Sequence, residues 1–355
     1  MYNPKKPYNK QTLKNIEKTW KNKVIKVGSY PMVNLGHNRF GLFHTDGIGT
    51  KGTIHYYQGS FKAAAQDALA MNVDDSIMVG VYPEVVVDHL MLEQQNEHAI
   101  NEFTNELSNL CKKLGIIIAG GETAITTSIK GMEAGITTYG TIDKNDIIKP
   151  KLKHDDKIIG IASSGIHSNG ITLAIKGLSM TRPNVEEGLL NCKLPYKPYN
   201  TIGQELTVPT HIYLPALEEV IQSHRKEISG MMHITGGAFT KLLNIAGDNL
   251  VYITRDNDLN PQKIFKQIMD GYALSSSQMY EFFNCGIGYV ITCKPSVAND
   301  IVDILNEKFH ADIIGTVSKS EVPMVKIESK LDKEILTYYN GTNLTCLIEK
   351  HWFLS

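Results

Sequence analysis

Acidic residues, glycines and a lysine recur in a fixed order between His44 and Thr123, and these residue types are suited to chemistry on phosphates. The first group is residues 46–51 (Asp-Gly-Ile-Gly-Thr-Lys) and the last is residues 120–123 (Gly-Gly-Glu-Thr). Single carboxylates lie between them, at Asp67, Asp74, Asp75 and Asp88. Mg²⁺ takes oxygen ligands, usually one or two carboxylates together with substrate phosphates. Because glycine also lets backbone N–H groups approach a phosphate closely, the order favours a site for Mg²⁺ and nucleotide phosphates.

Each group also has an ordinary structural interpretation. Asp46-Gly47 is typical of a hairpin turn, and residues 46–51 do not fit the P-loop pattern G-x-x-x-x-G-K-[ST]. Asp67 and Asp74 are seven residues apart and so lie on one face of a helix, where carboxylates are usually surface charge. The flanking residues 63–71 are too apolar for an exposed helix. At least one aspartate of this helix is therefore expected to face an interior site.

Two further carboxylates follow apolar runs. Asp88 comes after three valines, and a carboxylate at the end of a strand is a typical ligand position, although a turn cap explains it equally well. Glu122 follows Gly120-Gly121, where the apolar residues 116–119 are expected to enter a turn. Helix capping is one interpretation of Glu122, and a binding site is the favoured one.

The second half of the chain offers a loop of hydrogen-bond donors around His167. Residues 163–170 read Ser-Ser-Gly-Ile-His-Ser-Asn-Gly and follow an apolar strand pattern. Such a loop can hold a ribose phosphate through N–H groups and side chains. A single histidine is more often structural than catalytic, and Asn169 either positions substrate or takes a left-handed turn conformation. Cys285 has no base in its motif and is interpreted as a packing residue.

Strand and helix patterns alternate along both halves, which predicts an α/β or α+β protein. The polar stretch 143–156 is the expected boundary, giving domains at residues 1–150 and 151–327 and a C-terminal extension at 328–355. Strands are predicted at 85–88, 116–119, 137–142, 157–162, 251–254 and 287–293. Helices are predicted at 61–78, 96–114, 209–224, 261–270 and 297–309.

Composition limits the class of protein. The chain has 355 residues, a length for which two domains are expected. Its net charge is −1, so no general electrostatic attraction to nucleic acid or anionic membranes is expected. No apolar run is long enough to span a membrane. The basic first 26 residues lack the apolar segment of a signal peptide, and the five cysteines are dispersed. These features indicate a cytoplasmic protein with reduced thiols.

Nine blocks of sequence, in order, resemble the aminoimidazole ribonucleotide (AIR) synthetase family, whose members are also called phosphoribosylformylglycinamidine cyclo-ligases. The resemblance covers about residues 40–325, and the His-Ser-Asn-Gly block at 167–170 and the His-Ile-Thr-Gly-Gly block at 233–237 favour this branch over relatives that share the first domain. The blocks are residues 46–51, 67–71, 73–75, 87–88, 120–124, 164–170, 209–213, 233–237 and 283–288. The family's N-terminal Tyr-x-x-Ala-Gly-Val-Asp block has no counterpart, and Asp74 stands where many members have Asn.

The resemblance implies an ATP-dependent cyclo-ligase that closes formylglycinamidine ribonucleotide (FGAM) to AIR in purine biosynthesis, with ATP and Mg²⁺ as cofactors. It implies a homodimer of two-domain α/β chains, with the first domains forming a barrel-like sheet. Implied Mg²⁺ ligands are Asp46, Asp67, Asp75 and Asp88. Implied nucleotide contacts are Asp46, Gly47, Gly49, Thr50, Lys51, Gly120, Gly121, Glu122 and Thr123. Implied substrate contacts are Ser164, His167, Ser168, Asn169, His233, Thr235, Gly236 and Gly237, and the implied catalytic residues are His167, Lys51 and Asp88.

Three alternatives remain open at this point. A relative with the same ATP chemistry could use another acceptor, such as selenide or thiamine phosphate. The chain could be a non-catalytic ATP-binding homologue, because the N-terminal block is missing. It could also be a fragment of FGAM synthase, which the single copy of the fold disfavours.

Overall fold

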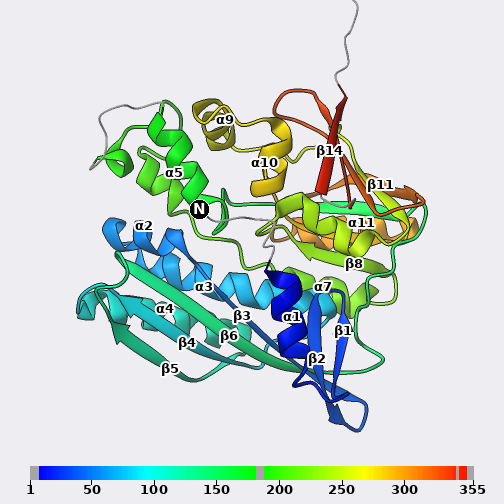
Figure 1. Cartoon of the computed structure of the whole chain (residues 1–355), viewed down its shortest axis with the longest axis horizontal. Helices are drawn as coiled ribbons and strands as arrows, with labels where there is room; N and C mark the ends of the chain where they lie inside the picture. Colours follow the sequence, from blue (N-terminus) through cyan, green and yellow to red (C-terminus); the bar gives the residue numbers. More distant parts are fainter. Residues whose placement is uncertain (1–7, 181–187, 341–343, 350–355) are drawn as a thin grey trace, which may run out of the picture.

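The computed structural model describes residues 8–180, 188–340 and 344–349, which build two β-sheets with helices between and around them (Figure 1). Both helices and strands occur in each half, which confirms the predicted α/β (α+β) class. Within these ranges, none of the helices combines the length and apolarity that crossing a bilayer requires.

The first sheet has six strands in the order β1-β2-β3-β6-β4-β5. Its central strand β6 alternates buried and half-buried residues, as a sheet with one packed face requires. Neighbouring strands are antiparallel except β4 and β5, which run parallel. The strands are β1 (Val24–Val27), β2 (Tyr30–Gly36), β3 (Arg39–Gly47), β4 (Val85–Leu92), β5 (Ile117–Ile125) and β6 (Met132–Asp143).

Helix α4 (Glu97–Leu114) has the apolar stripe expected from its sequence, begins at the cap Asn96 and ends at Gly115, whose φ is +70°. Helix α3 (Phe61–Ser76) is different, because it is buried nearly all round and lies between the first sheet and the second domain. The other helical elements of this half are α1 (Asn9–Glu17), α2 (Thr50–Gln58) and η1 (Ile77–Val79).

The second sheet has the order β14-β13-β12-β9-β11-β7-β10-β8 and is antiparallel except for β12 and β9. Strand β10 and its neighbour β8, which ends the sheet, are buried along their whole length. The strands are β7 (Lys157–Ala162), β8 (Ile228–His233), β9 (Asn249–Ile253), β10 (Ile287–Cys293), β11 (Ala311–Lys319), β12 (Met324–Glu328), β13 (Ile335–Asn340) and β14 (Leu344–Glu349). The helical elements are α5 (Ile171–Met180), η2 (Leu189–Asn191), α6 (Ile202–Leu206), α7 (Leu214–His224), η3 (Ala238–Leu242), α8 (Leu243–Ala246), α9 (Lys263–Gly271), α10 (Ser276–Phe282), η4 (Pro295–Val297) and α11 (Ala298–Asn306).

Two local predictions were wrong. The expected turn at Gly120-Gly121 is instead the middle of β5, where both residues pair with β4. Glycine in an edge strand is tolerated here because the Asp88 carboxylate lies over Gly121, where a Cβ would come within 2.1 Å of it. The helix expected from residue 209 begins only at Leu214, next to Pro215, which fits the first turn of a helix.

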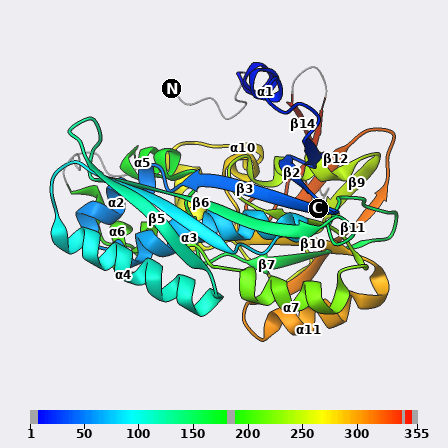
Figure 2. The same ribbon diagram turned by 90° about the horizontal axis from the view of Figure 1, so that it is seen from below.

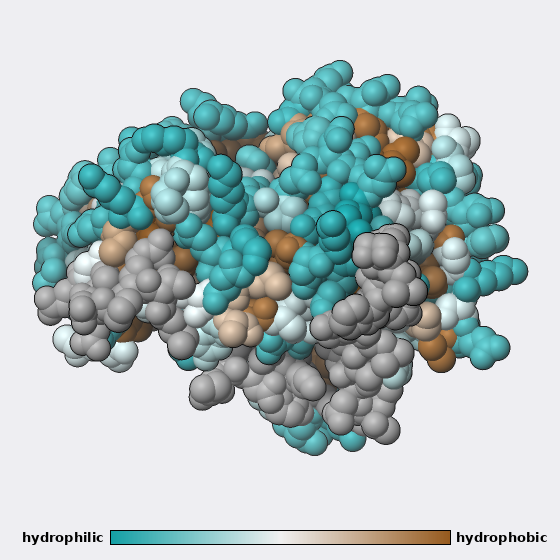
Figure 3. All heavy atoms as spheres, turned by 90° about the horizontal axis from the view of Figure 1, so that it is seen from above, coloured by the Kyte–Doolittle hydropathy of each residue, from teal (hydrophilic) through white to brown (hydrophobic). Residues whose placement is uncertain are grey.

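The two faces of the first sheet differ. One packs on α3, whereas the other leaves apolar side chains exposed; Figure 2 looks from below, with β3, β5 and β6 running across the molecule. On the opposite, upper side, shown in Figure 3, hydrophobic residues form small groups among larger hydrophilic areas.

Candidate active site between the two domains

Asp75, at the end of α3, is the centre of a polar cluster formed by both domains. Its Oδ1 lies 2.8 Å from His233 Nδ1, and its Oδ2 accepts a hydrogen bond of 3.1 Å from the Tyr30 hydroxyl. His44 Nε2 lies 3.3 Å from the same Oδ2. Burial alone would raise the pKa of Asp75, but the charge of Lys241 and the bonds to His233 and His44 hold it well below its usual range. Asp75 is therefore an ionised carboxylate at the domain junction.

Asp46 is the second carboxylate of this cluster. It lies at the end of β3, on the same strand as His44, and its Oδ1 accepts a 2.8 Å hydrogen bond from the N–H of Gly47. Burial raises the pKa of Asp46, the Gly47 bond lowers it, and the negative charge of Asp75 raises it further. Two carboxylates that repel each other at one site are stabilised by a cation.

Lys241 supplies a positive charge from the second domain. Its Nζ donates to Thr235 Oγ1 at 2.7 Å and to the carbonyl oxygen of His233 at 3.1 Å. Both acceptors are neutral, and in the described part of the chain no carboxylate oxygen lies within ion-pair distance of this ammonium. Its charge nevertheless acts on Asp75 and Asp46.

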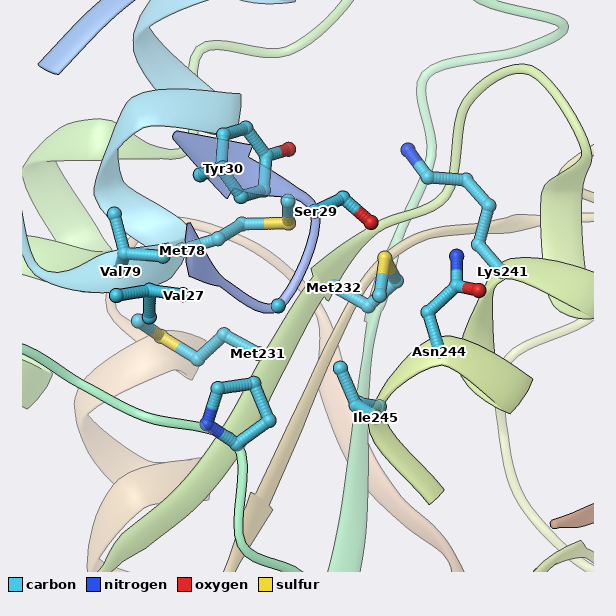
Figure 4. A pocket seen from close by; sticks show the side chains of 12 residues that line it. Val27, Ser29, Tyr30, Met78, Val79, Met231, Met232, Lys241, Asn244 and Ile245 are labelled. Carbon is cyan, nitrogen blue, oxygen red and sulfur yellow. The ribbon is translucent and has the colours of Figure 1, made fainter. Parts of the chain in front are cut away.

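A pocket opens beside this cluster, between the β1–β2 hairpin and the second domain. Figure 4 shows the Lys241 ammonium and the Tyr30 hydroxyl at one end of it, with methionine and aliphatic side chains, Ser29 and Asn244 in the rest of the wall. Its walls come from both domains and from Pro150 of the connecting segment. The apolar lining residues are Val27, Met78, Val79, Met231, Met232 and Ile245.

The predicted pair Lys51 and Asp67 lies in a separate place. Both side chains are fully buried, with Lys51 Nζ 2.8 Å from Asp67 Oδ2, and His55 Nε2 lies 2.7 Å from the same oxygen. Asp67 Oδ1 accepts from the N–H and hydroxyl of Thr210, at 2.7 and 2.6 Å, and from Ser168. Because Asp67 and Lys51 are fully buried and already neutralise each other, this geometry does not support Asp67 as a metal ligand or Lys51 as a phosphate contact.

The donors of residues 46–51 are also committed to the protein. Gly49 N–H donates to Glu133 Oε1 at 3.0 Å, so a carboxylate already occupies the N-terminus of α2. The Thr50 hydroxyl lies 2.7 Å from the Thr172 hydroxyl of the second domain. The expected phosphate cradle at Gly47, Gly49 and Thr50 is therefore closed by side chains in this structure.

Asp88 lies on β4 of the first sheet, and strand β6 separates it from Asp46 on β3. Both residues pair with Ile136 of β6, so they share a face of the sheet and their backbones are separated by two strand spacings, about 9.5 Å. Gly120, Gly121, Glu122 and Thr123 are all exposed on the neighbouring edge strand. Asp46 and Asp88 nevertheless line one pocket on this face, together with Thr45, His89 and Thr137. No group of three or more potential metal ligands is found in the described residues.

The structure brings the two predicted substrate loops together. Asn169 donates to Met71 Sδ at 3.8 Å, and its Oδ1 lies beside Gly236, where a Cβ would be 3.2 Å from it. Ser164 Oγ donates to the carbonyl of Pro209 at 2.6 Å. Loops 163–170 and 233–237 therefore form one wall facing α3, with Gly237 in a left-handed turn at φ +87°.

His167 lies behind this wall. Its ring is 1% exposed, and its Nε2 accepts the N–H of Ser164 at 3.2 Å. Burial, and then the charges of His233 and Lys51, hold its pKa well below the usual range, so the ring is neutral. His167 itself has the left-handed φ of +63°, a conformation that the sequence had suggested for Asn169. Its Nδ1 is buried without a hydrogen-bond partner among the described residues.

Asp74 has a structural role that explains its difference from Asn. Its two oxygens accept the N–H groups of Tyr213 and Leu214, at 3.1 and 2.9 Å, at the start of α7. A carboxylate at a helix N-terminus is favoured by the unpaired N–H groups there. Asp74 therefore attaches α3 to the second domain.

Three members of the cluster were not predicted from the sequence: Tyr30, His44 and Lys241. His44 and Asp46 are two residues apart on β3, so the alternation of side chains along a strand could have placed both on one face. Lys241 is a single charged residue among the apolar residues Phe239, Leu242 and Leu243, and this contrast is the signal in the sequence that could have identified it. Nothing in the sequence around Tyr30 indicates its contact with Asp75.

Comparison with known proteins agrees with this architecture. The model of the AIR synthase related protein N-terminal domain matches residues 28–142, and that of the C-terminal domain matches residues 153–328. A phosphoribosylformylglycinamidine cyclo-ligase of Methanocaldococcus jannaschii is 34% identical over 320 residues, 88% of this chain and 89% of that protein. The chain belongs to the phosphoribosylformylglycinamidine cyclo-ligase family. The family's enzyme from Thermococcus gammatolerans is 33% identical over 90% of this chain and 94% of its own length.

Solved structures share the cyclo-ligase family's fold at low identity. A ThiL protein complexed with AMPPCP and TMP aligns with a TM-score of 0.59 at 16% identity, over 90% of this chain and 93% of that one. A chain of the HypE–HypF complex aligns with a TM-score of 0.62 at 14% identity, over 96% of this chain and 98% of that one. Thermotoga maritima PurL complexed with FGAR aligns with a TM-score of 0.58 at 15% identity, over 89% of this chain and 48% of PurL. These likenesses confirm the two-domain fold expected of a cyclo-ligase.

Proposed function

We propose that this chain closes the imidazole ring of AIR from FGAM with ATP, releasing ADP and phosphate. The observation that carries the proposal is that the Asp75 carboxylate of the first domain contacts His233 of loop 233–237, with Asp46 near enough for the charge of Asp75 to act on it. The names of the similar full-length relatives support this reaction. ThiL complexed with AMPPCP and HypE in complex with ATP have the same fold, which supports nucleotide binding by this chain.

The reaction has two parts. The formyl oxygen of FGAM attacks the γ-phosphorus, the bond to the β–γ bridging oxygen breaks, and ADP leaves with the electron pair. The neighbouring amidine nitrogen then attacks the activated carbon, and phosphate leaves as the ring closes with loss of a proton. Both steps depend on alignment of the reacting atoms and on exclusion of water. Loops 163–170 and 233–237 would orient FGAM, and the β1–β2 hairpin would close the site around Tyr30.

Asp46 and Asp75 are the residues of this chain that fit a magnesium ion. Mg²⁺ needs only one or two carboxylates when phosphates and water complete its octahedron, and the Asp46–Asp75 repulsion is relieved by a cation. When bound, Mg²⁺ would neutralise charge on the transferred phosphoryl group. Asp67 and Lys51 would instead hold the domains in register, and His167 would fix the substrate loop. Asp88 and residues 120–123 remain a second predicted region, along β4 and β5.

A homodimer through the open face of the first sheet is part of the proposal. Apolar side chains on this face are 41–64% exposed, which is unusual for residues of a central sheet. Phe43 packs against Tyr139 in a tilted arrangement with ring centroids 4.6 Å apart, so the face already has an ordered aromatic centre. A second copy of the chain would cover it. The exposed apolar residues are Leu35, Phe43, Val87 and Ile117. We also propose that the enzyme is cytoplasmic, the location that the sequence indicated.

Product formation from FGAM, ATP and Mg²⁺ tests the function. AIR measured by diazo coupling should appear in a one-to-one ratio with ADP, and only when FGAM is present. ATP binding to the folded protein without AIR would contradict the cyclo-ligase proposal. ADP release that depends on thiamine phosphate or selenide, and not on FGAM, would instead identify a relative with another acceptor.

A further inference from the structure

We propose that Lys241 contacts the γ-phosphoryl group of ATP as it moves to the acceptor. This inference rests on the proposed function and adds a residue that neither the sequence motifs nor the family resemblance assigns. It starts from the position of the Lys241 ammonium between the carboxylates of the first domain and the glycine turn of the second.

The ammonium is held but not neutralised. Thr235 Oγ1 and the carbonyl of His233 accept two of its three N–H bonds and orient it, without cancelling its charge. Among the described residues, most other lysines that form side-chain hydrogen bonds or ion pairs contact a carboxylate, as Lys308 contacts Glu219 at 2.8 Å on the surface. A positive charge kept in place by neutral oxygens is available to a ligand anion.

The location also identifies which phosphate it meets. Asp46 and Asp75 belong to the first domain and are the candidates for the metal that ATP carries. Lys241 belongs to the second domain and follows Gly236-Gly237 in the chain. Gly236 in turn lies beside Asn169 of the other substrate loop. The transferred group must pass between these two sides, so the phosphate that reaches Lys241 is the γ-phosphate. Figure 4 shows the ammonium at the same end of the pocket as the Tyr30 hydroxyl, which donates to Asp75.

The chemical role is electrostatic. As the γ-phosphorus leaves the bridging oxygen for the formyl oxygen of FGAM, negative charge is spread over its three outer oxygens. A fixed ammonium beside them stabilises that charge, and no proton has to leave Lys241. The residue should therefore affect kcat and the affinity for a γ-phosphate, and should have little effect on the affinity for ADP.

The test compares Lys241→Met and Lys241→Arg with the surface control Lys308→Met in the full-length protein. Calorimetry with Mg²⁺ measures binding of ADP and of the non-hydrolysable analogue AMPPNP, and steady-state assays measure AIR formation. We expect Lys241→Met to lose at least about tenfold in AMPPNP affinity, to keep ADP affinity within about twofold, and to lose about a hundredfold in kcat. Lys241→Arg should recover part of both losses, whereas Lys308→Met should match the wild type.

The outcomes separate the two proposals. An unchanged ratio of AMPPNP to ADP affinity in Lys241→Met, with unchanged kcat, would overturn the role of Lys241 even if the wild type makes AIR. A Lys241-dependent preference for AMPPNP in a wild type that makes no AIR would support the phosphate contact and refute the cyclo-ligase. Equal loss of ADP and AMPPNP binding in both Lys241 variants would also overturn the proposed contact between Lys241 and the γ-phosphate, because that pattern indicates a structural role.

Discussion

Lys51 and Asp67 form an ion pair in which both side chains are fully buried, and the same carboxylate accepts hydrogen bonds from Thr210 of the other domain. Lys51 in turn donates to the carbonyl oxygen of Val208 at 2.6 Å. One buried charge pair of the first domain thus binds the extended segment that leads into α7. Its position makes it a mechanical link between the domains.

Asp67→Asn should destabilise the protein by about 3–5 kcal/mol at neutral pH, because it leaves the buried Lys51 ammonium without its counter-charge. The pKa of Asp67 is depressed, since the charge of Lys51 and the His55 bond outweigh burial. Its stabilising effect is therefore present above the unfolded pKa of about 4 and is lost as pH falls below it. Urea unfolding at pH 7 and pH 3 should show a smaller difference from the wild type at pH 3. The matched control is Asp270→Asn, whose partner Lys266 is exposed, and equal effects of the two variants would contradict the link.

Asp75→Asn and Asp46→Asn should remove the Mg²⁺-dependent part of nucleotide binding, since both carboxylates belong to the cluster at the domain junction. Asp88→Asn should retain it, because Asp88 lies over Gly121 on the far side of β6. Calorimetry with ADP, with and without Mg²⁺, measures the difference. Loss of Mg²⁺ dependence in Asp88→Asn alone would restore Asp88 as the ligand predicted from the sequence.

His44 should remain protonated to a higher pH than an ordinary histidine. Burial lowers the pKa of His44, but the hydrogen bond and charge of Asp75 raise it more, so the net shift is upward. A raised folded pKa contributes stability that is complete below the unfolded value of about 6.5 and is lost as pH rises through the folded pKa. An NMR titration of the ring should show this shift, and Asp75→Asn should abolish it. A His44 pKa at or below 6.5 in the wild type would disagree with the structure.

Glu205→Gln should stabilise the protein at pH 8 and leave it unchanged at pH 4. Burial raises the pKa of Glu205 to about 7, and its Oε2 has no hydrogen-bond partner among the described residues. The unfolded chain ionises this group near pH 4.3, so stability falls between that pH and about 7, by up to about 3 kcal/mol. Thermal melts of both proteins across pH 4–8 measure the effect. Equal melting temperatures at pH 8 would show that Glu205 is solvated.

Phe43→Lys should dissociate the proposed homodimer. Phe43 is 59% exposed at the aromatic centre of the open sheet face, and a lysine there would place two like charges across a two-fold interface. Sedimentation equilibrium should show a dimer for the wild type and a dimer dissociation constant at least about tenfold higher for the variant. Tyr272→Lys, a substitution of an exposed aromatic in the second domain, is the control. A wild-type monomer would remove this face as an interface.

Local patterns in the sequence determined several elements closely. Residues 157–162 and 287–293 form strands with the predicted bounds, because runs of β-branched and apolar residues there can be buried only in a sheet. The apolar residues around Asp67 and Asp74 correctly indicated a helix with carboxylates facing the interior. The order of the motifs identified the family before any contact was known.

Only the tertiary structure decided what each carboxylate does. Asp67, Asp74 and Asp75 lie on one buried helix, yet their partners are Lys51, the start of α7 and His233, which come from distant parts of the chain. Periodicity reports which face a side chain occupies and not which group it meets there. Residues 120–123 became a strand because β4 offered a free edge, which outweighed the turn preference of two glycines. Tyr30 and Lys241 joined the site because two domains close around α3, and pairing between domains leaves no periodic trace in the sequence.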